Sequence, residues 1–364
     1  MRVSTVLPVD DWRACGPAAH QAEEDGFDCV TANELRHEPF TPLAFAALAT
    51  RRVQLATSVA IAFPRSPMVV ANHAWDLQLH SRGRFILGLG SQVKAHNERR
   101  FSVPWVAPAA RMGEYVQALR AIFRCWENGE KLDFRGKHYN FTLMTPEFSP
   151  GPLGLPMVPI ALAAVGPLMS KTAARVADSV RLHGFATRRY LAEVVRPMLA
   201  DELAATGKTF ENFEITGGGF VVTGPDDAAV REAAEKIRYR VAFYGSTPAY
   251  RGVFDIHGLA DLGVKLTEMS KRGAWNDMAA QVSDEVLDLF VARAPYEGIA
   301  EAIERRFGGI VDTVSIDFSP GTSAATRRSV VEAIQRIPQA FRGFQGEVHL
   351  GREAGEVEVR AHRG

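Results

Sequence analysis

The sequence predicts a closed α/β barrel, a (β/α)8 TIM barrel, with insertions over the C-terminal face of the barrel. The 364-residue chain alternates eight apolar runs of strand length with helical patterns. The count of strands is even, and the first turn lacks the glycine-rich pattern of a dinucleotide-binding doubly wound sheet, which is the alternative fold. In such a barrel the reactive groups lie on loops at the carboxyl ends of the strands.

The first half of the chain supplies four of these strands. They are expected at 3–7, 27–31, 53–61 and 85–89, with helices at 12–25, 42–50, 68–80 and 111–126. Pro8 stops the first strand, and Asp10 or Asp11 can cap the helix that follows. The fourth strand is apolar on both faces, which places it at the centre of the fold.

The second half continues the alternation. Strands are expected at 158–164, 179–182, 213–222 and 311–318, with helices at 167–177, 188–206, 226–243, 282–306 and 322–340. Two irregular stretches, at about 128–157 and 245–280, are predicted insertions. We therefore expect one domain over 1–342 and a flexible tail over 343–364, which is rich in Gly, Glu and Arg.

The composition excludes several functions. The formal net charge is +0, so no global field draws the chain to nucleic acid or anionic lipid. The three cysteines and the scattered histidines fit neither a disulfide framework nor a metal constellation. No signal peptide or apolar span of ~18 residues is present. We expect a cytoplasmic protein without metal, nucleic-acid or membrane partners.

The stretch 81–92 contains the first candidate ligand site. Gly88, Gly90 and Ser91 leave the end of the fourth strand open, so that a ligand can approach backbone N–H donors suited to an anion. A dinucleotide-binding turn would need a third glycine where Val93 stands. We expect a phosphate group at this strand end.

Several motifs resemble the bacterial luciferase-like flavin and deazaflavin oxidoreductases. They are VQLATSV at 53–59, RFILGLGS at 84–91, FRGKHY at 134–139 and AAVGP at 163–167, and the resemblance runs in order from residue 1 to about 335. Residues 34–40, 62–67 and 96–100 resemble the branch that uses coenzyme F420, an 8-hydroxy-5-deazaflavin. The resemblance implies a luciferase-like barrel, a small-molecule substrate and a homodimer or higher homo-oligomer.

The resemblance also implies a cofactor site. A cis non-prolyl peptide would join Ser58 to Val59 behind the cofactor ring, although an ordinary strand end is the alternative. The phosphate would meet the turns after the fourth and fifth strands, and Arg99 would reach the phosphate or an acidic tail, unless it lies in a solvated turn. The implied cofactor contacts are Ser58, Val59, Gly90, Ser91, Gln92, Ala164, Val165, Gly166 and Arg99. Val165 replaces a glycine that is common in the family.

The loop after the second strand holds the candidates for proton transfer, Glu34 and His37. A solvent-exposed loop histidine is the alternative for His37. Sugar-phosphate dehydrogenases of the family have a histidine where Leu35 stands and an acid near Val93, so sugar-phosphate oxidation is not expected. Aromatic residues, which often belong simply to the core, could line an apolar substrate pocket. The candidates are Phe40, Phe63, Tyr250 and Trp275, with Trp105 and Tyr244.

The sequence therefore predicts an F420-dependent oxidoreductase that transfers hydride to or from an alcohol, a carbonyl or an activated double bond. Two alternatives remain. One is an FMN-dependent monooxygenase that uses reduced flavin and oxygen. The other is a non-catalytic flavin- or deazaflavin-binding protein, because the family's histidine and acid are missing.

Overall fold

The computed structural model describes residues 1–344. The predicted flexible tail, 343–364, lies outside the described residues except for Gly343 and Phe344. Phe344 is 5% exposed and packs against Phe341, with ring centroids 4.9 Å apart. Phe344 is therefore buried and Gly343 is half-buried, and the predicted flexible tail stays a prediction.

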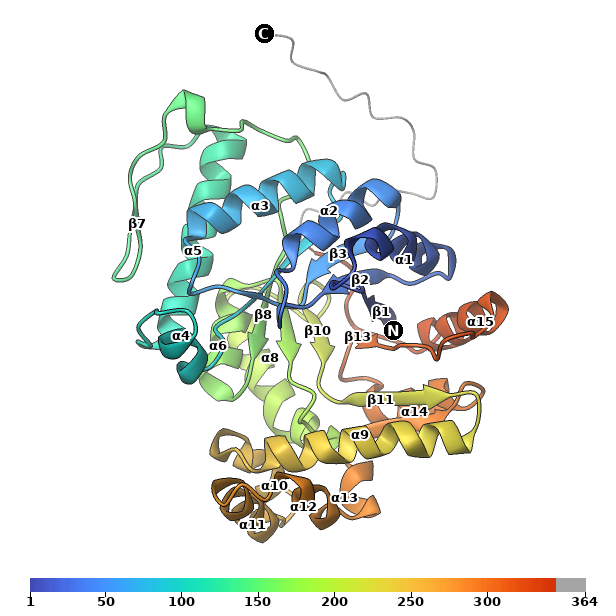
Figure 1. Ribbon diagram of the computed structural model, residues 1–364. Coiled ribbons are helices and arrows are strands. Elements are labelled where there is room, and N and C mark those ends of the chain that lie inside the picture. The colour runs from blue at the N-terminus through green and yellow to red at the C-terminus, as the bar shows by residue number, and fades with distance from the viewer. Residues whose placement is uncertain (345–364) are drawn as a thin grey trace.

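Eight parallel strands form the closed barrel that the sequence predicts (Figure 1). They are β1 (Arg2–Val6), β2 (Cys29–Ala32), β3 (Gln54–Thr57), β5 (Phe85–Gly90), β8 (Ile160–Ala164), β9 (Ser179–Leu182), β10 (Glu214–Gly217) and β13 (Thr313–Ser315). The pairing of β3 with β5 closes the ring. A short strand, β4 (Ala60–Ile61), follows β3 and pairs with the end of β5. The fold class is confirmed.

Helices surround the barrel on its outside (Figure 1). The principal ones are α1 (Trp12–Glu24), α2 (Phe40–Ala49), α3 (Pro67–His80), α5 (Pro108–Asn128), α6 (Pro167–Val176), α8 (Arg196–Ala205), α14 (Ile299–Phe307) and α15 (Ala324–Gln335). Local sequence sets their starts: the Asp11 side chain accepts a hydrogen bond from the Arg13 N–H, and Ser66 caps α3 just before Pro67. Short helices α4 (Lys94–Arg99) and α7 (Arg188–Tyr190) follow β5 and β9.

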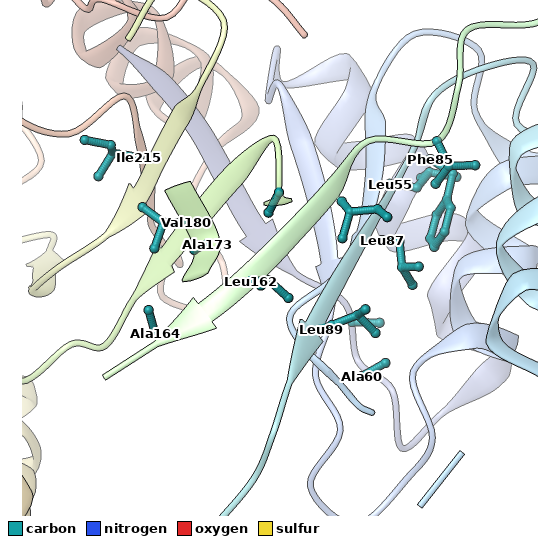
Figure 2. Packing of buried hydrophobic residues seen from close by; sticks show 14 of the residues in the cluster. Leu55, Ala60, Phe85, Leu87, Leu89, Leu162, Ala164, Ala173, Val180 and Ile215 are labelled. Atoms are coloured by element: carbon teal, nitrogen blue, oxygen red, sulfur yellow. The ribbon is translucent and has the colours of Figure 1, made fainter. Parts of the chain in front are cut away.

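The core lies in two layers because strand residues alternate between the helices and the barrel interior. On β5, Phe85, Leu87 and Leu89 belong to the outer cluster beneath the helices, part of which Figure 2 shows. Ile86 belongs instead to a small interior cluster that Phe341 and Phe344 join from the C-terminal segment. These two rings fill the barrel interior below its mouth.

The predicted seventh strand is divided in two. Gly217 and Gly218 have φ values of +84° and +82°, a backbone conformation that other residues rarely adopt. The chain turns there, so that only β10 stays in the barrel. The following strand, β11 (Phe220–Gly224), pairs in parallel with β12 (Val291–Pro295) in a separate two-stranded sheet.

The prediction of one helix over 282–306 is wrong, because part of this segment pairs with β11 in the small sheet. The segment contains α13 (Asp284–Asp288), then β12, and only then α14. Val291 and Ala292 are buried in the small sheet, and this tertiary pairing overrides the local helical pattern.

The second predicted insertion is helical and packs below the barrel in Figure 1. It follows α9 (Asp227–Gly245) and contains α10 (Arg251–Asp255), α11 (Ala260–Lys271) and α12 (Trp275–Met278). These helices and the small sheet share a second hydrophobic cluster, centred on Phe185, Phe254 and Phe290.

The first predicted insertion does not cover the mouth of the barrel. It lies along α5 as a hairpin, β6 (Phe134–Arg135) and β7 (Asn140–Phe141), followed by a 3-10 turn, η1 (Pro146–Phe148). Glu114 on α5 accepts hydrogen bonds from the N–H groups of 137–139, at 3.0, 2.6 and 2.6 Å. An insertion between a helix and the next strand begins at the amino-terminal face of a barrel, whereas ligand sites form on the opposite face.

No helix in the described part of the chain is long and apolar enough to cross a membrane.

Candidate cofactor and substrate site

A cavity of about 1250 Å3 opens at the carboxyl ends of β5, β8 and β9. Its walls are mainly apolar, and the start of the second insertion closes one side. The lining residues used below are Ser58, Val59, Ser91, Gln92, Lys94, Trp105, Ala163, Ala164, Val165, Lys171, Arg175, Arg181, His183, Tyr244 and Tyr250. Its position is the one where barrels of this class place ligand sites.

Ser58 and Val59 form a ridge in this cavity. A cis peptide bond joins them, as the sequence analysis predicts. The neighbouring strand is shaped to fit the ridge. A Cβ on Gly90 would stand 2.6 Å from Val59 Cγ2, and one on Gly88 would stand 1.9 Å from the Thr57 carbonyl oxygen. Both glycines of β5 are therefore required for close packing rather than for a left-handed turn.

The loop after β5 brings Ser91 and Gln92 to the cavity wall. Gln92 has a φ of 58°, and its side-chain oxygen accepts a hydrogen bond from the Val93 N–H at 2.9 Å. The buried Asn97 holds the loop, because its amide group donates to the Ser91 and Val93 carbonyl oxygens at 2.8 and 3.1 Å. Gly90 supports the wall from behind and does not line the cavity.

The turn after β8 leads into the N-terminus of α6. Ala164 and Val165 line the cavity, and Gly166 precedes the helix with a φ of +77°. The positive φ is at Gly166 and not at Val165. Valine at 165, where the family commonly has glycine, therefore causes no backbone strain. Gly166 itself lines an adjoining smaller pocket. The free N–H groups of a helix N-terminus favour an anion at this point.

Four cationic side chains line the cavity, and no Asp or Glu among residues 1–344 does so. Three of them, Lys94, Lys171 and Arg175, lie near the rim and are largely exposed. Glu202 pairs with Lys171 at 3.6 Å and with Arg175 at 2.5 Å, so one carboxylate faces two cations. Lys94 lies 4.0 Å from Glu98, so three rim cations face two carboxylates and the rim carries one excess positive charge.

Arg99 is not brought to the cavity. It is exposed at the end of α4 and is absent from the lining residues, because the helix turns it away from the mouth. The adjacent Arg100 donates to the Leu35 carbonyl oxygen at 2.9 Å and lies over the Phe101 ring. The contact of Arg99 with the cofactor stays a prediction, and the cations that do line the cavity are Lys94, Lys171, Arg175 and Arg181.

The two residues proposed for proton transfer also lie outside the lining. The Glu34 side chain is 8% exposed, receives two hydrogen bonds from Arg65 at 2.8 and 2.9 Å, and accepts a third from the Ile61 N–H at 2.7 Å. Its carboxylate thus ties the loop after β2 to β4 and to the start of α3. His37 is an exposed loop residue.

The aromatic residues divide between wall and core. Tyr250, Tyr244 and Trp105 line the cavity. Phe40 stacks on His73 and Phe63 meets Trp105 edge to face, both being buried in the main core. Trp275 is 40% exposed beside Phe243. Phe40, Phe63 and Trp275 lie outside the cavity lining, and their pocket role stays a prediction. Short-range pattern does not distinguish a wall from a core.

His183 is a site residue that the sequence reasoning missed. It follows β9 and continues its alternation, so it faces inward like Arg181. Burial lowers its pKa to about 4. Its Nδ1 lies 3.0 Å from the Phe185 N–H, which donates to it, and its ring contacts Tyr244 and Tyr250. The alternation of side chains along β9, with a period of two residues, could have predicted that His183 faces the same side as Arg181.

One group in the described residues could hold a metal ion: the ligand atoms of His20, Glu23 and Glu24 lie within 4.8 Å of one another. The Glu23 carboxylate already accepts hydrogen bonds from the N–H groups of 51–53. We assign no metal there, and the expected absence of a metal stays a prediction.

Comparison with known proteins agrees with this geometry. The family model described as luciferase-like monooxygenase matches residues 2–313. An uncharacterised protein of Mycobacterium tuberculosis is 44% identical over 318 residues, which cover 87% of this chain and 92% of that one. The F420-dependent glucose-6-phosphate dehydrogenase of Kineococcus radiotolerans is 33% identical over 202 residues, 52% of this chain and 58% of that one.

Among solved structures, the coenzyme F420-dependent tetrahydromethanopterin reductase of Methanopyrus kandleri superposes with a TM-score of 0.72. The match covers 92% of this chain and 97% of that one at 18% identity. At this identity the likeness shows the shared fold.

Proposed function

The chain is an enzyme of the luciferase-like monooxygenase family, and we propose that it transfers hydride between coenzyme F420 and a small organic substrate. The observation that carries the proposal is the cavity itself. It combines the Ser58–Val59 ridge, apolar walls and a cationic rim without a lining carboxylate. This combination suits a planar ring with a phosphorylated, acidic side chain.

The described residues fit such a cofactor. The ridge and Ala163 offer a surface for the ring, and the close approach at Gly88 and Gly90 fixes the ridge. Ser91, Gln92 and the α6 N-terminus after Ala164, Val165 and Gly166 would hold the phosphate. Lys94, Lys171 and Arg175 would attract the acidic tail of F420.

A deazaflavin supplies hydride chemistry when bound, because carbon replaces the N5 of a flavin. The chain's own contribution is to bind, orient and exclude water. The substrate class that follows is an alcohol, a carbonyl or an activated double bond. Glu34 and His37 do not line the cavity. Because Glu34 accepts the Ile61 N–H of β4, we propose that Glu34 positions β4 and the ridge.

The sugar-phosphate substrate of the Kineococcus relative is not carried over. Leu35 and Val93 stand where that class of enzyme has a histidine and an acid, and both side chains are largely exposed here. A homodimer and a cytoplasmic location stay predictions.

An FMN-dependent monooxygenase is the second candidate, since the family is described by that reaction. The same phosphate contacts would serve FMN. The cationic rim favours F420, because FMN lacks the acidic tail that would meet the excess positive charge there. The non-catalytic alternative has no support among the named relatives above, one of which is a dehydrogenase.

The function is tested by turnover. Reduced F420 is mixed anaerobically with the protein and a panel of ketones and enones, and the return of oxidised F420 absorbance is followed. The proposal expects substrate-dependent oxidation of F420 and no oxygen uptake with reduced FMN. Oxygen uptake with reduced FMN, together with no F420 turnover, would establish the monooxygenase instead.

A further inference from the structure

β9 places two hydrogen-bond donors at the floor of the cavity. Arg181 and His183 are two residues apart, and both line the cavity. Val180 belongs to the outer core, and Leu182 packs against that core while it also reaches the cavity edge. Side chains at i and i+2 of a strand project from the same face. Arg181 and His183 therefore share the inward face of the barrel.

Small residues on the neighbouring strands make room for Arg181. Ala163 is its register partner on β8. On β5, the Arg181 Nε atom lies 3.1 Å from the point where a Cβ on Gly88 would stand. The guanidinium therefore reaches across the floor of the barrel toward β5, the strand that packs against the ridge.

The charge of Arg181 has no protein partner among residues 1–344. Its Nε atom is buried without a hydrogen bond, and the side chain makes no ion pair. The buried acid on the adjacent strand, Glu214, is taken by Arg2, Ser179 and Thr313. The side chain is half-buried, and an N–H donor that is shielded from solvent without an acceptor is unfavourable, which favours an acceptor supplied by a ligand.

His183 offers a second donor beside it. Because its Nδ1 accepts the Phe185 N–H, the proton of the neutral ring is on Nε2. Nε2 has no hydrogen-bond partner in the described residues, and His183 lines the cavity. The lowered pKa keeps the ring neutral at physiological pH, so Nε2 stays a donor.

We propose that Arg181 and His183 together bind an oxygen acceptor of the substrate, a carbonyl or carboxylate oxygen, at the floor of the cavity. That the ligand is a substrate rests on the proposed function. That Arg181 and His183 form a pair of donors rests on their positions on β9, on the absence of a lining carboxylate among residues 1–344 and on the room left by Gly88. It selects ketones, enones and oxo acids over hydrocarbons and amines. A carbonyl oxygen of the cofactor ring has the same chemistry, and the experiment separates the two sources.

The test uses benzoate as the probe in isothermal titration calorimetry, with the apo-protein and with the F420-loaded protein. We expect benzoate to bind both forms. R181Q should weaken binding at least about ten-fold, R181K less, and H183Q by about three-fold or more. R196Q is the control of equal charge change, because Arg196 lies on α8 over the Phe210 ring, away from the cavity. It should leave benzoate binding unchanged.

Two results would overturn the proposal. One is the same benzoate affinity in the wild type and in R181Q or R181K, including no binding in any of them, with all proteins folded by circular dichroism. The other is benzoate that binds the apo-protein and is displaced by F420, since the acceptor would then belong to the cofactor. If F420 itself does not bind the protein, while benzoate binds the apo-protein in an Arg181-dependent way, the result counts against F420 and not against the pair.

Discussion

Gly88 and Gly90 are the residues through which β5 accommodates the ridge. Neither has a left-handed backbone, so their role is the absence of a side chain. Gly88 faces the Thr57 carbonyl oxygen on one side and the Arg181 Nε atom on the other. A side chain there would press on both the ridge and the proposed substrate contact.

We predict that G88A lowers the free energy of unfolding by at least about 2 kcal/mol, because its methyl group would stand 1.9 Å from the Thr57 oxygen and force the backbone to shift. Urea unfolding followed by circular dichroism measures the change. G252A is the matched control. Gly252 is exposed in α10 with only Tyr190 near its Cβ position, at 3.8 Å, so alanine there should be neutral or stabilising by up to about 1 kcal/mol. Equal losses in both variants would contradict this view of Gly88.

His183 predicts a pH dependence of stability. Burial lowers its pKa to about 4 in the folded protein, while an imidazole in the unfolded chain titrates near its ordinary value of about 6.5. Between these values the unfolded chain binds more protons, so this residue lowers the free energy of unfolding as the pH falls.

H183Q should therefore gain stability relative to the wild type as the pH is lowered from 7 to 4.5, by up to about 3 kcal/mol. Asp312 has its pKa raised to about 6 by burial, and its opposite effect is present in both proteins and cancels in the difference. Urea unfolding at several pH values gives that difference. A constant difference across this range would show that His183 titrates normally.

At the scale of single residues, the sequence predicted the parts of the site that are backbone features. The ridge at Ser58 and Val59 and the turns at Ser91 and Val165 follow from motifs in register along the chain. For Glu34 and His37 the proton-transfer role stays a prediction, and the sequence did not show their surroundings, because a polar loop shows which groups can ionise and not which of them pair. The ion pair of Glu34 with Arg65 joins residues 31 apart, and only the tertiary fold reveals it.

At the scale of elements, α5 holds the first insertion against the outside of the barrel. Glu127 near its end accepts hydrogen bonds from the N–H groups of Leu153 and Gly154, at 2.9 and 3.0 Å. Together with Glu114 it fixes a segment that has little regular structure. The side of the barrel on which such a segment lies follows from its place between a helix and a strand, a rule that could have corrected the prediction.

E114A should release the β6–β7 hairpin without unfolding the barrel. The variant removes an acceptor shared by three backbone N–H groups, so trypsin cleavage after Arg135 or Lys137 should become at least about ten-fold faster. E147A is the control within the same insertion, because Glu147 is exposed and makes no hydrogen bond or ion pair with residues 1–344. An unchanged cleavage rate in E114A would show that other contacts hold the hairpin.

The small sheet of β11 and β12 marks the limit of local prediction. Eight alternations were expected, and eight barrel strands are found. Even so, the chain from Phe220 onward leaves the barrel, and β12 lies within a stretch of helical pattern. The pairing of β11 with β12, about 70 residues later in the chain, decides this part of the fold. Such long-range pairing cannot be predicted from the periodicity of apolar residues.

At the scale of the whole molecule, one barrel end is filled and the other is open. Phe341 and Phe344 fill the interior below the mouth, whereas Gly88, Gly90 and Ala163 leave space near the carboxyl ends of the strands. Arg181 and His183 of β9 line this space, with further cations on the rim. This arrangement supports the proposal that an anionic, planar cofactor enters from that end.

The most direct test of the account is the choice between two cofactors. Apo-protein is titrated with oxidised F420 and, separately, with FMN, and the fluorescence and absorbance of each cofactor are followed. We predict micromolar binding of F420 and at least about ten-fold weaker binding of FMN, because the rim cations meet the acidic tail that FMN lacks. FMN binding as tight as or tighter than that of F420 would contradict the account and place the enzyme with the flavin monooxygenases.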